Sequence, residues 1–168
     1  MIAPTLHTQR LTLRMPVLAD FGPRADFYAS DRSVFEDGPL DRRAAWKVFA
    51  SEVGQWPLMG FGPFSVDDTA TGNYLGEVGI YQPEGYPEPE LGWFTTPNAE
   101  GKGVAFEGAR AVMVWARKTF GWDHLVNYID PRNQRSIALA LRLGGARVAA
   151  PGADPTDVVI RHDLPGLA

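Results

Sequence analysis

Cysteine is absent from the chain, and histidine occurs only three times, as His7, His124 and His162. Without cysteine there is no disulfide, no thiolate metal site and no cysteine nucleophile. The three histidines lie far apart and form no HExxH-type pair, so a zinc enzyme is not expected. We therefore predict that the protein holds no metal.

Long apolar runs and an excess of basic residues are also missing. No stretch approaches the length needed to span a bilayer, and the N-terminus has no apolar signal core. The formal net charge is −4, whereas nucleic-acid-binding domains usually carry a basic excess. We expect a cytoplasmic protein that binds neither membranes nor nucleic acid.

Size and composition are those of an ordinary globular domain. The chain has 168 residues, of which 45% are hydrophobic and 21% charged. This length favours one domain over residues 1–168, because two domains would each be close to the size at which a core is hard to build.

Hydrophobic periodicity predicts the element order β, α, α, β, β, β, α, β, α, β, β. Asp20 is expected to cap the first helix, and the second is expected to run from about Asp41 to a stop at Gly54. The other predicted helices cover 103–120 and 133–143, and the predicted strands cover 8–15, 61–66, 74–81, 90–96, 125–129, 146–149 and 157–162. Mixed hairpin and crossover connections indicate an α/β or α+β domain.

The most informative segment, Pro97–Ala105, joins a predicted strand to a predicted helix. Gly101 and Gly103 allow the backbone to bend tightly and to approach a ligand closely. The first free amides of the helix, together with its dipole, make an anion site there, and Lys102 adds a positive charge. A pyrophosphate is the natural occupant of such a turn.

Other phosphate motifs fit this segment less well. A nucleotide P-loop requires glycine in place of Thr96 and serine or threonine in place of Val104. A dinucleotide motif requires glycine in place of Phe106 and an acidic residue at the end of a second strand, where Asp123 does not lie. A glycine-rich turn that binds nothing stays an alternative, because such turns are common.

Pro97–Ala105, followed by Glu107, resembles the acetyl-CoA pyrophosphate loop of the GNAT N-acetyltransferase superfamily, Gln/Arg-x-x-Gly-x-Gly/Ala. Glu100, Gly103 and Ala105 occupy its fixed positions, with Glu100 replacing the usual Gln or Arg. We expect the Glu100 side chain to face solvent or Lys102, because a carboxylate beside a pyrophosphate is unfavourable.

Two further segments carry the resemblance. Asn133 to Ser136, followed by Leu141–Gly145, is similar to the N-x-x-S…L-G-F helix of the family. The opening Thr8-x-Arg10-Leu11-x-Leu13-Arg14 resembles the start of its RimJ/RimL-like branch, whose best-known members acetylate ribosomal-protein N-termini.

The resemblance implies a GNAT-like fold, with a mixed, mostly antiparallel sheet splayed between two strands and flanked by helices. The strands ending at Thr96 and Ile129 would open a slot for the pantetheine arm of acetyl-CoA. It also implies the residues that hold this cosubstrate: the backbone of Trp93, Phe94 and Thr95, the amides of Gly101, Lys102, Gly103, Val104 and Ala105, and the side chains of Asn133 and Ser136.

Catalysis needs a base for the substrate ammonium and an acid for the departing thiolate. Glu90 is the first candidate base and Glu77 the second; the alternatives are a solvated charge for Glu90 and the outer face of the sheet for Glu77. Ser136 is the candidate acid, since the tyrosine that the family often uses would fall at Ala140. Ser136 and Asn133 are equally suited to cap a helix. Glu107 is expected to have a structural role, neutralising the helix dipole or capping nearby amides.

The resemblance thus implies an N-acetyltransferase that passes an acetyl group from acetyl-CoA to a primary amine, in a protein N-terminus or a small molecule. The missing tyrosine leaves a non-catalytic acyl-CoA-binding or sensing domain as the alternative. The sequence leaves open whether the chain forms a homodimer.

Overall fold

The computed structural model describes residues 3–167, which form one eight-stranded sheet in the order β1-β2-β3-β4-β5-β6-β8-β7. The strands are β1 (Leu6–His7), β2 (Leu11–Arg14), β3 (Pro63–Asp68), β4 (Tyr74–Tyr81), β5 (Glu90–Thr95), β6 (His124–Ile129), β7 (Ala146–Arg147) and β8 (Val158–Asp163). The helices are α1 (Phe21–Ala29), α2 (Arg42–Met59), α3 (Val104–Phe120) and α4 (Gln134–Arg142), with 3-10 turns η1 (Leu18–Asp20), η2 (Asp31–Ser33) and η3 (Pro97–Ala99). The predicted fold class is confirmed.

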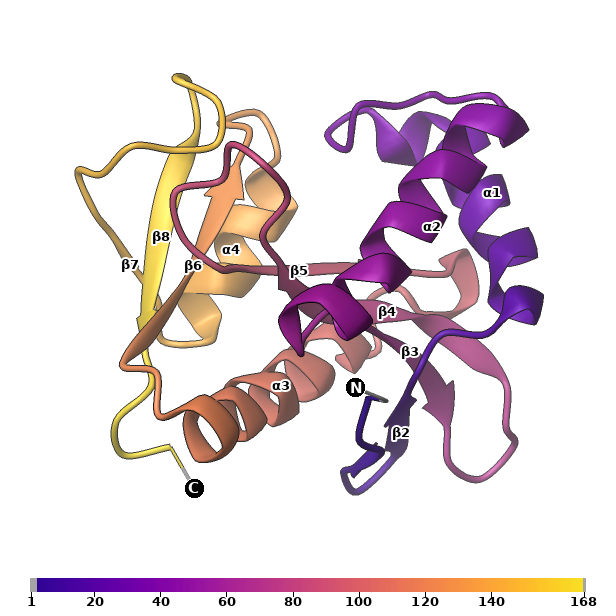
Figure 1. Ribbon diagram of the computed structural model, residues 1–168, viewed down its shortest axis with the longest axis horizontal. Helices are drawn as coiled ribbons and strands as arrows, with labels where there is room; N and C mark the ends of the chain where they lie inside the picture. Colours follow the sequence, from indigo (N-terminus) through magenta and orange to yellow (C-terminus); the bar gives the residue numbers. More distant parts are fainter. Residues whose placement is uncertain (1–2, 168) are drawn as a thin grey trace.

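The sheet divides into two parts between β5 and β6. Every other neighbouring pair is antiparallel, whereas β5 and β6 run parallel and are paired only at Glu90 and Val126. Figure 1 shows the result: α1 and α2 lie with β2, β3 and β4 on one side, β6, β8 and α4 lie on the other, and α3 runs below both parts. The gap in pairing faces α3 and α4 and positions the candidate site.

Two apolar clusters cover opposite faces of the sheet. On the α3 side, Leu13, Phe64, Val78 and Leu91 are fully buried together with residues of α3. On the α1/α2 side the buried residues are mostly aromatic: Phe21, Phe27, Tyr28, Phe49 and Phe94. Alternate residues of β4 and β5 thus contact different helices, as the two-residue period of a strand requires.

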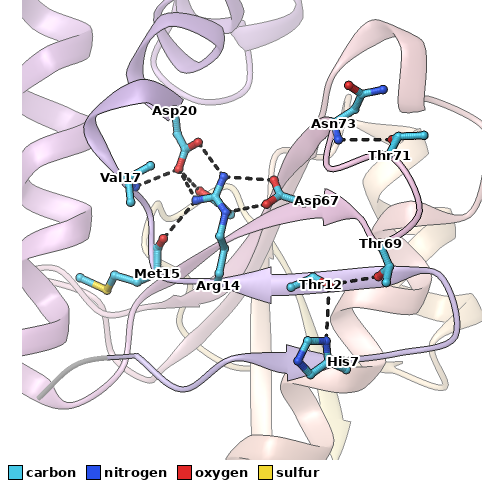
Figure 2. A network of polar contacts seen from close by, with 11 residues as sticks. His7, Thr12, Arg14, Met15, Val17, Asp20, Asp67, Thr69, Thr71 and Asn73 are labelled. Carbon is cyan, nitrogen blue, oxygen red and sulfur yellow. Dashed lines mark hydrogen bonds and ion pairs between the residues drawn. The ribbon is translucent and has the colours of Figure 1, made fainter.

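Asp20 has a different role from the one predicted. Its carboxylate makes no capping bond to α1; it accepts the backbone N–H of Val17 at 2.9 Å and the hydroxyl of Ser65 at 2.7 Å. It also pairs with Arg14, which reaches across to Asp67 on β3 (Figure 2). Burial acts to raise the pKa of Asp20, but the hydrogen bonds from Arg14, Val17 and Ser65 outweigh it and lower that pKa. Asp20 therefore joins the start of α1 to the sheet.

The second helix is longer than predicted, because α2 continues through Gly54 and Pro57 and ends at Gly60, whose φ is 83°. Glycine inside a helix costs only about 1 kcal/mol relative to alanine, so it need not end one. Trp56 compensates: it is completely buried, and its indole N–H donates to the carbonyl of Pro63 at 2.7 Å. Tertiary packing thus overrides the local stop signal.

Within residues 3–167 no helix has the length and apolarity required to cross a membrane. The same part of the chain contains no group of three or more histidine, aspartate and glutamate side chains arranged to hold a metal ion.

Candidate acyl-group and anion site

A large open cleft of about 1610 Å³ runs along the sheet edge between β5, α3, α4, η2 and the β1–β2 hairpin. Of the residues predicted to bind the cosubstrate, it is lined by Trp93, Phe94, Thr95, Gly101, Gly103, Val104, Ala105, Asn133 and Ser136. Lys102 is exposed and does not line the cleft. Residues as far apart in the sequence as Trp93 and Ser136 thus meet at one surface.

The turn before α3 owes its shape to two glycines in the left-handed region. Gly101 has φ 73° and Gly103 has φ 78°, a conformation that side chains with a Cβ rarely adopt. The first helical bond runs from the Glu107 N–H to the Gly103 carbonyl at 3.0 Å. The amides of Val104, Ala105 and Phe106 therefore have no partner within the helix and are free to bind an anion.

The hairpin formed by β1 and β2 is hydrogen-bonded to this turn and to the first turn of α3, and these contacts are called the brace below. Arg10 donates through Nε to Glu107 at 2.7 Å and through Nη1 to the carbonyl of Lys102 at 3.1 Å. Thr8 donates its hydroxyl to Glu107 at 2.6 Å. Burial acts to raise the pKa of Glu107, but the bonds from Thr8 and Arg10 outweigh burial and lower it. Glu107 is structural, as predicted, but it binds the hairpin rather than the amides of its own helix.

The prediction that the Glu100 side chain faces solvent or Lys102 was wrong. Its carboxylate pairs with Arg32 of η2 at 2.9 Å and with Arg135 at the start of α4. Two cations, from η2 and from the start of α4, thus neutralise a carboxylate that lines the same cleft as the free amides of α3. The sequence around Glu100 contains neither arginine, so local reading could not find this bridge.

Basic residues line the α3 and α4 side of the cleft, although the whole chain is acidic. Arg110 and Lys118 come from α3, and Arg142 of α4 lies over the ring of Phe106 at 5.0 Å. With Arg10 and Arg135, Arg110 and Arg142 give the end of the cleft near the turn a positive field that suits a ligand with several phosphates, whereas Lys118 lies in the last turn of α3.

A second, small cavity of about 40 Å³ lies between β5 and β6, where the two strands separate. Glu90, Asn133 and Ser136 line it, and the last two also line the large cleft. Asn133 caps α4 by accepting the backbone N–H of Ser136 at 3.2 Å, and the Ser136 hydroxyl donates to no other residue among 3–167. The capping role and a ligand-binding role are therefore compatible at Asn133.

Glu90 is half-buried at this cavity. One of its oxygens, Oε1, accepts the backbone N–H of Tyr128 at 3.0 Å, and within residues 3–167 its carboxylate forms no ion pair. Burial raises the pKa of Glu90 well above its ordinary value, although the Tyr128 N–H acts in the opposite direction. A carboxyl group at a cavity wall whose pKa is raised by burial binds a proton more readily than an ordinary glutamate, which makes it a candidate general base.

Glu77 lies elsewhere, on the α1/α2 face of β4, and lines neither cavity. It is 1% exposed, lies 3.5 Å from Nη2 of Arg24, and accepts the hydroxyl of Tyr81 at 2.9 Å. Arg24 is itself held by both carboxylate oxygens of Glu52, at 2.7 and 2.9 Å. Burial raises the pKa of Glu77 to about 7, against the opposing effect of Arg24. The ring of Tyr81, whose hydroxyl donates to Glu77, is half-buried.

Sequence reasoning missed several residues that shape the cleft. The motif containing Thr8 and Arg10 was recognised, but nothing in it indicated that both residues would bind Glu107. Asn127 and His162 carried no signal either, yet they meet beside the small cavity, with His162 Nε2 2.5 Å from Asn127 Oδ1. An alternating strand pattern predicts burial but not which buried polar groups pair.

Comparison with known proteins agrees with this geometry. A family model described as an acetyltransferase (GNAT) domain matches residues 10–146. A solved acetyltransferase from Agrobacterium tumefaciens str. C58 is 41% identical, with a TM-score of 0.91 over 96% of this chain and 95% of its own. A putative ribosomal-protein-serine acetyltransferase from Vibrio cholerae is 20% identical, with a TM-score of 0.76 over 97% and 99% of the two chains. Spermidine N-acetyltransferase from Vibrio cholerae, solved with CoA and spermine, is 14% identical, with a TM-score of 0.71 over 92% and 94%. The last two similarities establish the shared fold alone.

Proposed function

Because this chain belongs to the GNAT acetyltransferase family, we propose that it transfers the acetyl group of acetyl-CoA to a primary amine. The observation that carries the proposal is that a turn with free amides and a cavity with an uncompensated carboxylate open into one cleft. The first suits the phosphates of coenzyme A, and the second suits the proton of an ammonium group. We take residues 1–168 as one catalytic domain.

The residues of the cleft fit acetyl-CoA, which supplies an acetyl group activated as a thioester. Amides between Gly101 and Ala105 would hold the pyrophosphate, and the basic residues of α3 and α4 would neutralise it. The backbone of β5 from Trp93 to Thr95 lacks a partner strand on its β6 side, so it is free to pair with the pantetheine arm as an added strand would. Asn133 and Ser136 border the same path.

Glu90 is the base that we favour, because it lines the small cavity and Glu77 does not. Its Oε1 stays with the Tyr128 N–H, and its other oxygen takes a proton from the acceptor ammonium, directly or through a water molecule. The neutral amine nitrogen then attacks the thioester carbonyl, and the C–S bond breaks. The Ser136 hydroxyl supplies a proton to the thiolate and regains one from the nitrogen as the amide forms, and the proton held by Glu90 leaves to solvent. Glu77 is the second candidate, acting through Tyr81.

The acceptor is proposed to be a protein N-terminus or a small amine, as in the RimJ/RimL-like branch. In support, two residues of the opening motif that resembles this branch, Thr8 and Arg10, bond to Glu107 in the helix that follows the pyrophosphate turn. A family resemblance spread over three separate segments thus converges on one site.

A turnover assay tests the proposal. The purified chain is mixed with acetyl-CoA and a panel of amines and N-terminal peptides, thiol release is followed with a chromogenic disulfide, and products are identified by mass spectrometry. We expect thiol release that depends on the amine and an equal yield of acetylated product. Tight binding of acetyl-CoA with no thiol release across the panel would favour the alternative, a non-catalytic acyl-CoA sensor.

A further inference from the structure

The pairing of β5 with β6 stops after one position, and the hydrogen bonds show where. The Val126 N–H donates to the Pro89 carbonyl at 3.3 Å, which is the first bond of a regular parallel ladder. The pairing of Glu90 with Val126 is completed by the Leu91 N–H, which faces the Val126 carbonyl. The bond after that in such a ladder would run from the Tyr128 N–H to the Leu91 carbonyl. That bond is absent, although both groups belong to strands on either side of the small cavity.

Each of the two backbone groups has a side-chain partner instead. The Tyr128 N–H donates to Glu90 Oε1 at 3.0 Å, and the Leu91 carbonyl accepts Nδ2 of Asn127. Two side chains therefore replace one ladder bond. The replacement keeps both buried backbone groups satisfied, which an empty gap between the strands would not do.

Asn127 is fixed in the orientation that this requires. The residue is 2% exposed, and its Oδ1 lies 2.5 Å from Nε2 of His162, which is 1% exposed. Burial lowers the pKa of His162 to about 4, so the ring is neutral at pH 7. Because Asn127 Nδ2 donates to the Leu91 carbonyl, Asn127 Oδ1 must be the atom that faces His162, and Nε2 of His162 must carry the proton that it donates. The flipped amide would place Oδ1 against the Leu91 carbonyl, where two acceptors would meet.

We infer that Asn127, oriented by His162, is a positioning residue that keeps β5 and β6 apart so that the slot can admit the acyl arm of acetyl-CoA. The inference rests on the proposed function for its ligand, but the strand separation itself does not. As long as Asn127 Nδ2 donates to the Leu91 carbonyl, this carbonyl already has a hydrogen-bond partner and does not require the Tyr128 N–H. Without the amide, the Tyr128 N–H becomes the partner that satisfies it, and the strands close over the cavity.

Asn127→Val tests this, because valine suits a strand and offers no hydrogen-bond donor. We expect coenzyme A, measured by calorimetry, to bind about tenfold more weakly, since only the fraction of molecules with an open slot can bind it. In the wild type the NMR shift of the Tyr128 amide should follow the ionisation of Glu90. In the variant that amide should instead show a scalar coupling through a hydrogen bond to the Leu91 carbonyl.

Leu125→Val is the matched control, because Leu125 lies two positions earlier on β6 and is fully buried. It should lower stability while leaving coenzyme A affinity and the Tyr128 titration unchanged. Asn127→Ala serves as a second variant if the valine does not fold. Wild-type affinity together with a retained Tyr128 titration in a folded variant would overturn the inference. Failure of the wild type to bind coenzyme A would overturn the proposed function instead, and the NMR comparison would still decide whether Asn127 separates the strands.

Discussion

The two ends of the cleft are built in different ways. The anion-binding turn is local: two glycines within three residues set the backbone, and the free amides follow directly in the chain. The slot between β5 and β6 is not local, because its opening depends on Glu90, Asn127 and His162 from three different strands. The first kind of site is visible in a sequence, and the second requires the folded sheet.

The difference also has an electrostatic side. Arginines and lysines surround the turn, and the carboxylates near it, Glu100 and Glu107, are already paired. At the slot the carboxylate of Glu90 has no cation among residues 3–167. The turn therefore presents positive charge, whereas no cation opposes the rise that burial causes in the pKa of Glu90 at the other end of the cleft.

Breaking the turn should have the largest effect. Gly103→Asp places a negative charge beside the free amides, and we expect coenzyme A to bind roughly 100-fold more weakly, because like charges a few ångströms apart repel by several kcal/mol near a protein surface. Gly103→Asn is the control, because asparagine tolerates a positive φ and carries no charge. Calorimetry on both variants separates charge from strain, and equal affinities for the two would contradict the charge argument.

Removing the base should come next. Glu90→Gln keeps an oxygen that can accept the Tyr128 N–H but cannot take a proton, so we expect kcat to fall by roughly 10²-fold. A general base works only when ionised, so the wild-type rate should rise with pH through the raised pKa of Glu90, and the variant should lack that limb. The measurement is kcat/KM for the acceptor between pH 5 and 9. A limb that survives in the variant would exclude Glu90 as the base.

Glu77 offers a contrast, since its carboxyl is buried behind the slot. A carboxyl whose pKa rises from 4.5 to about 7 on folding contributes stability that is fully present below pH 4.5 and is lost as pH rises through 7. Glu77→Gln should therefore gain on the order of 2 kcal/mol relative to the wild type between pH 5 and pH 8. Urea unfolding at the two pH values measures it. An equal difference at both values would mean that Glu77 does not titrate in this range, and loss of the acid limb of the rate would make Glu77 the base.

Loosening the brace should have the smallest effect. Arg10→Met removes the contacts to Glu107 and to the Lys102 carbonyl, but half of the Arg10 side chain is exposed, so solvent already weakens the ion pair. We expect coenzyme A affinity to fall about threefold to fivefold. Arg117→Met is the matched control, since Arg117 makes similar bonds to Gly121 and Asp123 at the far end of the same helix. An equal loss of affinity in the control would rule out a specific role for Arg10.

Much of the fold followed from the sequence. Strands and helices alternate with clear periods, and the turn signals around Gly72 and Pro97 separate them, so the element order from β2 onward was predicted correctly. The strand predicted over 8–15 was wrong at its start, because the chain forms the short strand β1 (Leu6–His7) and a hairpin turn before β2 (Leu11–Arg14). The end of α2 was wrong because Trp56 stabilises a helix past Gly54 by tertiary contacts, including its packing against Trp115 of α3. Asp20 was misassigned for the same reason, since Arg14 and Ser65 compete for its carboxylate.

Of the candidate site, the sequence predicted the backbone geometry better than the partners of the side chains. A positive φ at Gly103 is a local property, whereas the partner of Glu100 depends on where η2 and α4 come to lie. The resemblance located Glu90 and Ser136 at the cavity, but it offered no way to foresee that Glu90 also satisfies the Tyr128 amide. The roles proposed for these residues stay predictions.

The contacts between the β1–β2 hairpin and α3 join residues that are far apart in the sequence, and they lie beside the candidate pyrophosphate turn. Arg10 and Glu107 are 97 positions apart, so the loop between them must close before their bonds can form. During synthesis the hairpin leaves the ribosome before α3, so its bonds to Glu107 cannot form until α3 has also been released. The pyrophosphate turn is therefore expected to become rigid late in folding, and contacts of this range slow folding in general.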